Sequence, residues 1–165
     1  MGKCFTDDNS ILVLSPNAAE ALKMFPGDIA RVEGPEGMCT ILVLLVDKDL
    51  EDGECSLNCT ARENVNVDFG GRVSITHMSA YIGYLKHVNI LPFADTIHGL
   101  TGSLLDDFLV PYFKETYRPL AKGDHVACRK AQRTVDFKVI DFDRQEFGIV
   151  ARDTIIQMEG KPLQR

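Results

Sequence analysis

The sequence predicts a mainly β protein, arranged as a barrel or sandwich rather than as a doubly wound sheet. Many short β-branched or apolar segments are each bounded by Gly, Pro or Asp, and only three short segments have a helical pattern. The longest apolar run, residues 41–46, is far shorter than the roughly 18 residues of a membrane helix. A chain of 165 residues holds one domain or two small ones, each with a modest core.

The first half is expected to contain five strands and two short helices. One helix follows the N-cap pair Ser15-Pro16 and runs to Met24, because Ser caps helices and Pro fits their first turn. The other covers a turn or two around residues 60–65. The expected strands are residues 11–14, 29–32, 40–46, 72–76 and 85–91. Residues 40–46 are apolar on both faces, so either the rest of the protein or a partner must cover the outward row.

The second half is expected to contain four strands and one short helix. The expected strands are residues 125–128, 134–140, 148–150 and 154–158. Ser103 and Asp106 have the spacing of a helix cap, an apolar stripe follows, and Pro111 is expected to end the helix after about two turns. A helix that short is not stable alone, so we expect it to plug or bridge a β-structure.

An internal repeat occurs in the first half. Residues 21–32 and 64–75 align without gaps, and each copy reads helix, glycine, strand. Gly27 permits the positive φ of a turn, and Asp28 after it can accept backbone N–H bonds. The second copy has Gly71 in place of that Asp, so its turn is expected to be less firmly held. Two such units resemble the pseudo-twofold halves of a double-psi β-barrel.

The distribution of charge and the number of cysteines favour some classes of partner and of cellular compartment over others. The chain has 7 basic and 13 acidic residues through residue 91, but 11 of each after it. An acidic first half repels phosphate and argues against nucleic-acid binding there, whereas it suits a partner that carries Arg or Lys. Five irregularly spaced cysteines predict reduced thiols in a cytosolic or nuclear protein. The N-terminus lacks the pattern of a secretory signal.

A series of landmarks runs from about residue 7 to residue 160. They include Asp8-Asn9-Ser10, Pro26-Gly27-Asp28, Leu91-Pro92, Gly99-Leu100-Thr101-Gly102, Tyr117-Arg118-Pro119, Lys122-Gly123-Asp124 and Glu159-Gly160. In order and spacing they resemble the N-terminal adaptor- and substrate-binding domain of the valosin-containing protein family of AAA+ ATPases. These are hexameric unfoldases that extract ubiquitylated proteins.

The resemblance implies a fold and a non-catalytic role. The implied fold is a double-psi β-barrel lobe (residues 1–91), a linker (92–95) and a smaller four-stranded β-barrel-like lobe with short helices (96–165), with a groove between the lobes. The chain has no P-loop, so ATP and Mg²⁺ are expected only in a parent protein, with no cofactor or metal in this chain. The isolated domain is expected to be a monomer, without nucleic-acid binding or membrane insertion. The implied setting is the ubiquitin–proteasome pathway and ER-associated degradation, in cytoplasm and nucleus.

Matching the family motif position by position gives an expected adaptor-binding groove. Its residues are Asp8, Ile11, Phe25, Asp28, Val43, Leu45, Tyr84 and Tyr117. An apolar cleft with acidic edges and two phenols suits a loop that brings Phe, Pro and Arg. The implied partners are ubiquitin-regulatory X domains, short basic helical motifs and a ubiquitin-receptor heterodimer. Alternatively, Asp28 fastens only its own turn, Phe25 closes the barrel, and Tyr117 belongs to the core.

Two arginines and three departures complete the comparison with the family. Arg129 and Arg133 match positions near the ATPase ring, or else belong to an exposed basic turn. Gly71 stands where the family usually has an Asp. Gly83 stands where a Lys is common, so the basic charge expected in the groove wall is missing at that position. The loop of residues 33–37 is acidic where the family is often basic.

The sequence gives little support for an enzyme active site. Cys55 and Cys59 lack a second pair of zinc ligands, and His125 and Cys128 point to opposite faces of a strand. The triplets that begin at Asp95 and Asp153 are similar to aspartic-protease loops but lack their glycine. The alternative from another class is a stand-alone double-psi barrel enzyme or a nucleic-acid-binding β-barrel.

Overall fold

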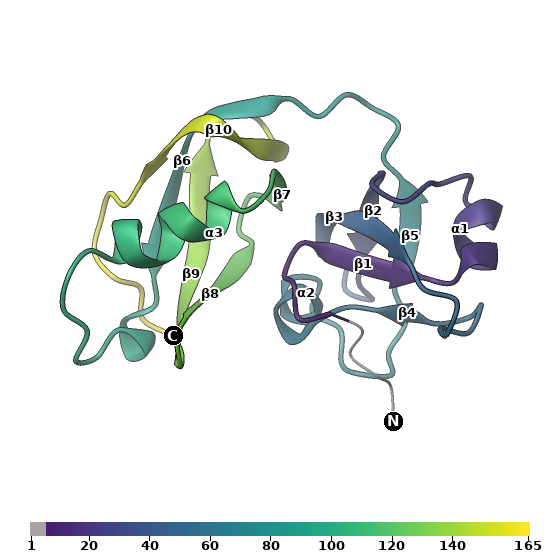
Figure 1. Ribbon diagram of the computed structural model, residues 1–165, viewed down its shortest axis with the longest axis horizontal. Helices are drawn as coiled ribbons and strands as arrows, with labels where there is room; N and C mark the ends of the chain where they lie inside the picture. Colours follow the sequence, from purple (N-terminus) through teal and green to yellow (C-terminus); the bar gives the residue numbers. More distant parts are fainter. Residues whose placement is uncertain (1–5) are drawn as a thin grey trace. The chain divides into compact units, whose positions relative to one another are not determined.

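The computed structural model describes residues 6–165 and is mainly β, with two curled half-barrel sheets (Figure 1). The mainly β prediction is confirmed. The chain divides into two compact units, one ending at Tyr81 and the other beginning at Ile82. No helix within residues 6–165 has both the length and the apolar character needed to cross a membrane.

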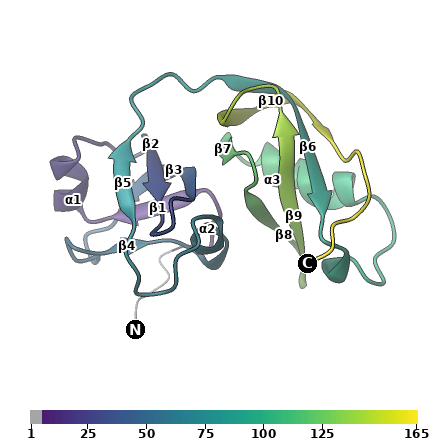
Figure 2. The same cartoon turned by 180° about the vertical axis from the view of Figure 1, so that it is seen from behind.

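The first unit contains one five-stranded sheet and two one-and-a-half-turn helices. In chain order its elements are β1 (Ile11–Leu14), α1 (Pro16–Ala21), β2 (Ile29–Glu33), β3 (Cys39–Val46), β4 (Cys55–Ser56), α2 (Cys59–Asn64) and β5 (Ser74–His77). The strand order is β4-β1-β3-β2-β5, and β1 runs parallel to β3 (Figure 1 and Figure 2). The core holds Leu12, Leu14, Ala30, Val32, Leu42 and Leu44 with apolar residues of both helices. The sheet therefore buries the even-numbered face of β1, β2 and β3.

The repeat extends to the geometry of the helix ends. Ser15 and Asn58 each cap their helix by accepting the N–H of the residue three positions on. Two residues after each helix the chain has a positive φ, at Lys23 (57°) and at Asn66 (53°). Such angles are uncommon outside glycine, so their occurrence at matching positions shows one local structure built twice.

Two tight turns share one design, and a third keeps part of it. In the turns ending at Asp28 and Asp124, the Asp N–H donates to the carbonyl three residues earlier (3.0 and 3.1 Å). The carboxylate of the same Asp accepts the N–H of that earlier residue, Phe25 (2.8 Å) or Ala121 (2.9 Å). Gly123-Asp124 lies outside the two repeat copies (residues 21–32 and 64–75), yet its turn has the same form.

The turn at Gly71 keeps only part of this design. The Gly71 N–H donates to Asp68 O (2.8 Å), but residue 71 has no carboxylate to accept the N–H of Asp68. A Cβ at Gly71 would lie 2.7 Å from Val67 Cγ2 and 3.0 Å from Asp68 O. The residue after the turn glycine is therefore held to glycine by the packing of Val67.

The second unit contains a second five-stranded sheet. Its elements are β6 (Tyr84–Pro92), the 3₁₀ turn η1 (Ala94–Thr96), the π-helical turn η2 (Leu105–Leu109), α3 (Val110–Lys114), β7 (Arg118–Ala121), β8 (His125–Lys130), β9 (Arg133–Phe142) and β10 (Phe147–Gln157). The strand order is β7-β10-β6-β9-β8. Four of the strands lie within residues 96–165, and β6, the central one, precedes them. The segments expected at residues 148–150 and 154–158 are one strand, β10, with a register shift between Val150 and Ile155.

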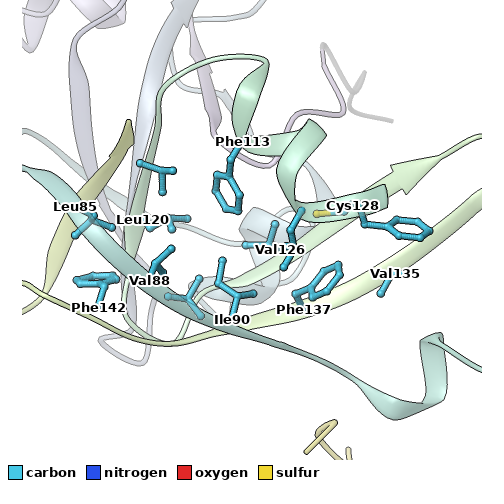
Figure 3. Close-up of a cluster of buried hydrophobic side chains, with 14 residues drawn as sticks. Leu85, Val88, Ile90, Phe113, Leu120, Val126, Cys128, Val135, Phe137 and Phe142 are labelled. Carbon is cyan, nitrogen blue, oxygen red and sulfur yellow. The ribbon is translucent and has the colours of Figure 1, made fainter. Parts of the chain in front are cut away.

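The helix of the second unit covers one face of this sheet, as expected for a short helix. Val135, Phe137 and Val139 of β9 are fully buried, which confirms the alternation seen in the sequence. Phe108 and Phe113 pack into the same cluster, and Figure 3 shows Phe113 directed toward the sheet side chains.

The expectation that Pro111 ends this helix is wrong. The cap is as expected, with Ser103 Oγ accepting the N–H of Asp106 (3.2 Å). The chain then passes through the π-helical turn η2 and continues in α3 to Lys114. Pro111 lies in the first turn of α3, where a missing N–H removes little hydrogen bonding.

Near its start, β6 has backbone N–H groups that donate to the Asp143 side chain instead of to a neighbouring strand. Asp143 Oδ1 accepts the N–H groups of Lys86 (3.0 Å) and His87 (3.2 Å). Partial desolvation alone would raise the pKa of Asp143, but these backbone bonds and the N–H of Asp143 itself outweigh it and lower the pKa. The carboxylate thus stabilises the irregular edge in its charged form.

Candidate functional site

β3 brings together the three segments that carry the first-unit residues of the expected groove. Val43 N donates to Ser10 O, and Gly27 N donates to Leu44 O, both at 2.8 Å. Leu44 N in turn donates to Asp28 O at 2.8 Å. We call the resulting group the Phe25 surface; it comprises Asp8, Ile11, Phe25, Asp28, Val43 and Leu45.

The apolar members of the Phe25 surface are partly open to solvent. Ile11 and Ile29 flank Val43 across three neighbouring strands, and both Ile11 and Val43 are half-buried. Leu45 is 43% exposed and Phe25 is 74% exposed. The alternative that Phe25 closes the barrel is therefore wrong, because its ring is among the most exposed apolar groups of the described chain.

The two carboxylates of the Phe25 surface hold their own backbone. Asp8 Oδ1 accepts the N–H of Ser10 (2.8 Å). Asp28 Oδ2 accepts the N–H of Phe25 and lies 3.5 Å from His77 Nε2. Asp28 does fasten its own turn, and its side chain remains one-third exposed (33%). Its Oδ1 takes no hydrogen bond from residues 6–165 and stays available to an external donor.

The two tyrosines of the expected groove form a pair on the second unit. The rings of Tyr84 and Tyr117 lie 5.7 Å apart at 59°, and their exposed fractions are 52% and 50%. The alternative that Tyr117 belongs to the core is therefore wrong; Phe113 occupies the core instead.

Arg118 fixes the backbone beside this tyrosine pair. The residue is buried, its Nε donates to Tyr112 O (3.1 Å), and its guanidinium lies 3.7 Å from the centre of the Tyr112 ring. Its Nη2 also pairs with Glu115 at 3.0 Å. These contacts tie the end of α3 to the start of β7, and Tyr117 lies between the two elements.

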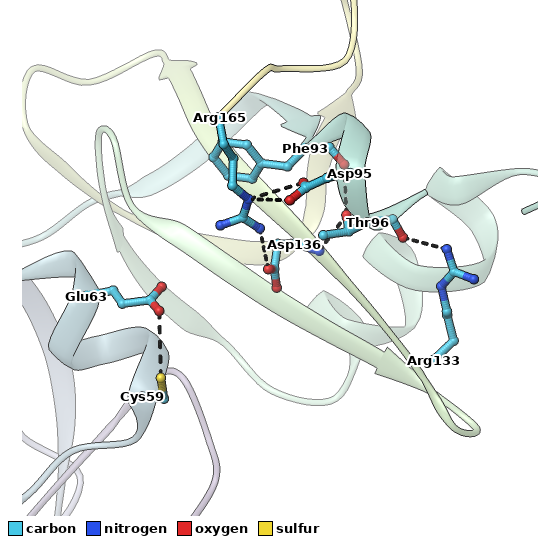
Figure 4. A network of polar contacts seen from close by, with 8 residues as sticks. All are labelled: Cys59, Glu63, Phe93, Asp95, Thr96, Arg133, Asp136 and Arg165. Carbon is cyan, nitrogen blue, oxygen red and sulfur yellow. Dashed lines mark hydrogen bonds and ion pairs between the residues drawn. The ribbon is translucent and has the colours of Figure 1, made fainter. Parts of the chain in front are cut away.

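The two arginines expected near an ATPase ring, of which Figure 4 draws Arg133, differ in their contacts. Arg133 is half-buried and donates from Nη2 to Thr96 O and His98 O, both at 2.8 Å. Arg129 is exposed, with Nε 3.4 Å from Thr134 Oγ1. Arg133 therefore anchors the segment after η1.

Sequence reasoning did not single out Arg165 or Arg144. Arg165 pairs with Asp95 (3.0 Å) and Asp136 (2.6 Å) and stacks over Phe93, which holds the end of the chain beside β6 (Figure 4). Arg144 lies against Gly83. The absence of a side chain at Gly83, noted as a departure, was the only sequence signal for this arginine.

The groups considered for enzyme chemistry are poorly placed for it. Burial raises the pKa of the Cys128 thiol strongly, which disfavours the thiolate a nucleophile needs. Cys59 is exposed, and its Sγ lies 3.7 Å from Glu63 Oε1. Cys4 lies outside the described residues. Within residues 6–165, no group of three His, Cys, Asp or Glu side chains could hold a metal ion.

A search of family models finds no match to the chain.

Proposed function

We propose that this chain is the non-catalytic N-terminal domain of a valosin-containing-type AAA+ ATPase, and that it recruits adaptors and ubiquitylated substrates for unfolding. The observation that carries the proposal is the Phe25 surface, where a largely exposed phenylalanine stands next to an open carboxylate oxygen. The proposed fold is a double-psi β-barrel followed by a smaller, four-stranded β-barrel-like lobe. The twice-built helix end and turn support the barrel.

The chemistry of the Phe25 surface suits a partner loop with an apolar residue next to an arginine. Phe25, Val43 and Leu45 offer apolar area, and burying one Phe side chain contributes about 2 kcal/mol. Asp28 Oδ1 can accept a guanidinium N–H, which adds specificity more than affinity. Separately, the tyrosine pair of the second unit supplies two phenols that can contact a proline or aromatic ring.

The proposed partners are ubiquitin-regulatory X domains, short basic helical motifs and a ubiquitin-receptor heterodimer. A small apolar contact with one ion pair gives micromolar binding, and a hexameric parent would raise it by multivalency. Arg129 and Arg133 are proposed to face the ATPase domains of that parent, in the cytoplasm and nucleus. Its ATP and Mg²⁺ would bind outside this chain.

Titration of a ubiquitin-regulatory X domain against the chain by isothermal calorimetry tests the proposal. Phe25→Ala is expected to weaken binding about 30-fold, the equivalent of one buried Phe. Val43→Asp places a charge among apolar contacts and is expected to abolish binding.

Phe69→Ala is the matched control, because Phe69 is 65% exposed on the corresponding turn of the other repeat. Binding that is intact in both Phe25→Ala and Val43→Asp would remove the proposed surface. Hydrolase activity, or RNA affinity that falls steeply with salt, would favour the other class of barrel.

A further inference from the structure

Two large apolar side chains at the end of β6 are buried on the face of the sheet opposite to the core. Leu91 is 7% exposed and Phe93 is 6% exposed. They alternate along the chain with Ile90, which belongs to the core of the second unit, so they point to the other face. Another segment must therefore cover them.

Residues 159–165, which we call the strap, lie along this face. Glu159 N donates to Asn89 Oδ1 (2.8 Å), and Asn89 Nδ2 donates back to Glu159 O (3.2 Å). A Cβ on Gly160 would lie 3.1 Å from Leu91 Cδ1, so the strap backbone is in contact with that side chain. The first part of the strap thus covers Leu91.

The next part of the strap pairs with the end of β6 as an added parallel strand would. Leu163 N donates to Pro92 O, and Ala94 N donates to Leu163 O, both at 2.8 Å. Two residues further on, the Arg165 guanidinium lies 4.4 Å from the centre of the Phe93 ring. The strap therefore places its leucine and its arginine on either side of Phe93 in sequence register.

Two carboxylates bind the arginine of the strap. Arg165 Nε lies 3.0 Å from Asp95, and its Nη2 lies 2.6 Å from Asp136 (Figure 4). We call the surface under the strap the Phe93 strip; it comprises Leu91, Phe93, the backbone of residues 92–94, Asp95 and Asp136. The strip suits an extended chain in which a leucine is followed two positions later by an arginine.

The strap is held by contacts that open easily. Each of its residues is exposed except Leu163, which is half-buried. Exposed ion pairs contribute little, and a segment with few buried apolar contacts opens far more often than the whole unit unfolds. Opening uncovers the Phe93 ring and leaves Pro92 O and Ala94 N without their strand partner. Such backbone groups at an edge readily pair with another extended chain.

We propose that the Phe93 strip binds an extended Leu-x-Arg segment of a partner protein, and that the strap is its intramolecular competitor. The strap itself shows the chemistry of the partner, because its leucine takes the position of an added strand and its arginine reaches the carboxylates. A partner binds only while the strap is open, so its apparent affinity is reduced by the open fraction. This inference does not depend on the proposed function, because every residue involved belongs to the second unit.

A peptide with the sequence of the strap tests the proposal. Acetyl-Lys-Pro-Leu-Gln-Arg-amide is titrated at millimolar concentration into the ¹⁵N-labelled full chain, and the amide signals of Phe93 and Ala94 are followed by NMR. We expect Arg165→Gln to bind the peptide about tenfold more tightly than the wild-type chain. The variant loses the two ion pairs and the ring contact that close the strap, but it keeps both carboxylates of the strip. The same peptide with Gln in place of its Arg should bind more weakly to this variant.

A second variant separates opening of the strap from recognition of the peptide. Asp136→Asn also removes an ion pair of Arg165, so the Leu163 amide should exchange with solvent faster in Asp136→Asn and in Arg165→Gln alike. Asp136→Asn damages the strip as well, so it should not gain the affinity for the peptide that Arg165→Gln gains.

Arg152→Gln is the matched control for charge. It removes one exposed positive charge from β10 and so raises the general attraction for a cationic peptide by as much as Arg165→Gln does. Both the exchange of the Leu163 amide and the affinity for the peptide should stay as in the wild-type chain. Retained NMR dispersion verifies that each variant folds.

The proposal is overturned if the peptide shifts neither Phe93 nor Ala94 in Arg165→Gln, or if this variant and the wild-type chain bind it equally. It is also overturned if the Gln peptide binds Arg165→Gln as tightly as the Arg peptide, or if Arg152→Gln gains the same affinity. The adaptor titration is a separate outcome: a failure there removes only the family function, and a failure here removes only the role of the Phe93 strip.

Discussion

At the scale of single residues, Asp28 and Asp124 do the same work in different surroundings. Each carboxylate accepts the N–H of the residue three positions earlier. Asp124 is 7% exposed, whereas the Asp28 side chain is 33% exposed. Water can replace a lost acceptor only at Asp28, so the two turns differ in what they contribute to stability.

We expect Asp124→Ala to lower the free energy of unfolding of the second unit by about 1–3 kcal/mol, because Ala121 N–H would be left buried without its acceptor. Asp28→Ala should cost the first unit less, about 1 kcal/mol or below. Urea denaturation followed by the amide signals of each unit measures both. Asp124→Asn, which keeps a side-chain oxygen, is the control. Equal costs at the two sites would contradict the burial argument.

At the scale of elements, local signals predicted the starts of helices and the interiors of strands. Ser15 was recognised as a cap because its side chain bonds a backbone N–H three residues on, a purely local event. The π-helical turn η2 and the continuous strand β10 were not predicted. Both depend on how the backbone fits against distant strands, which spacing within one segment does not encode.

Asp143 gives the irregular edge of β6 a dependence on pH. Its pKa in the folded chain lies below the ordinary value of 3.8, so its contribution to stability is fully present above that value and is lost as pH falls through the folded pKa. Asp143→Asn should therefore lower stability at neutral pH and flatten its decline in acid. Urea midpoints between neutral pH and strong acid measure this. Asp153→Asn, at an exposed carboxylate of β10, should keep the wild-type acid profile.

At the scale of the whole molecule, each unit has its own sheet and its own core. The sequence-based division assigned residues 85–91 to the first lobe, because Pro92 looked like a boundary. In the structure these residues form most of β6, which pairs with both β9 and β10. The pairing joins residues that are 40 to 70 positions apart, and no local pattern reports it.

We expect a fragment of residues 82–165 to fold by itself, and a fragment of residues 96–165 to remain unfolded because it lacks the central strand. Amide dispersion in ¹H–¹⁵N spectra and a cooperative thermal transition distinguish the two. A folded 96–165 fragment would show that β10 and β9 can pair without β6.

The candidate site was predictable to the extent that it depends on exposed side chains near turns. Phe25 and Tyr84 were recognised by their position in motifs, and both are exposed. The contact of Arg144 with Gly83 was not predicted, because it depends on an empty space at Gly83 that only the folded chain creates.

The crowding at Gly71 limits how far the two turns can exchange residues. A carboxylate at this position would be strained, because Val67 Cγ2 fills the space beside it. We expect a smaller residue at position 67 to make the exchange of Gly71 to Asp less costly. The two halves of the repeat are thus not interchangeable at this position, because a carboxylate after Gly70 requires the Val67 side chain to give way as well.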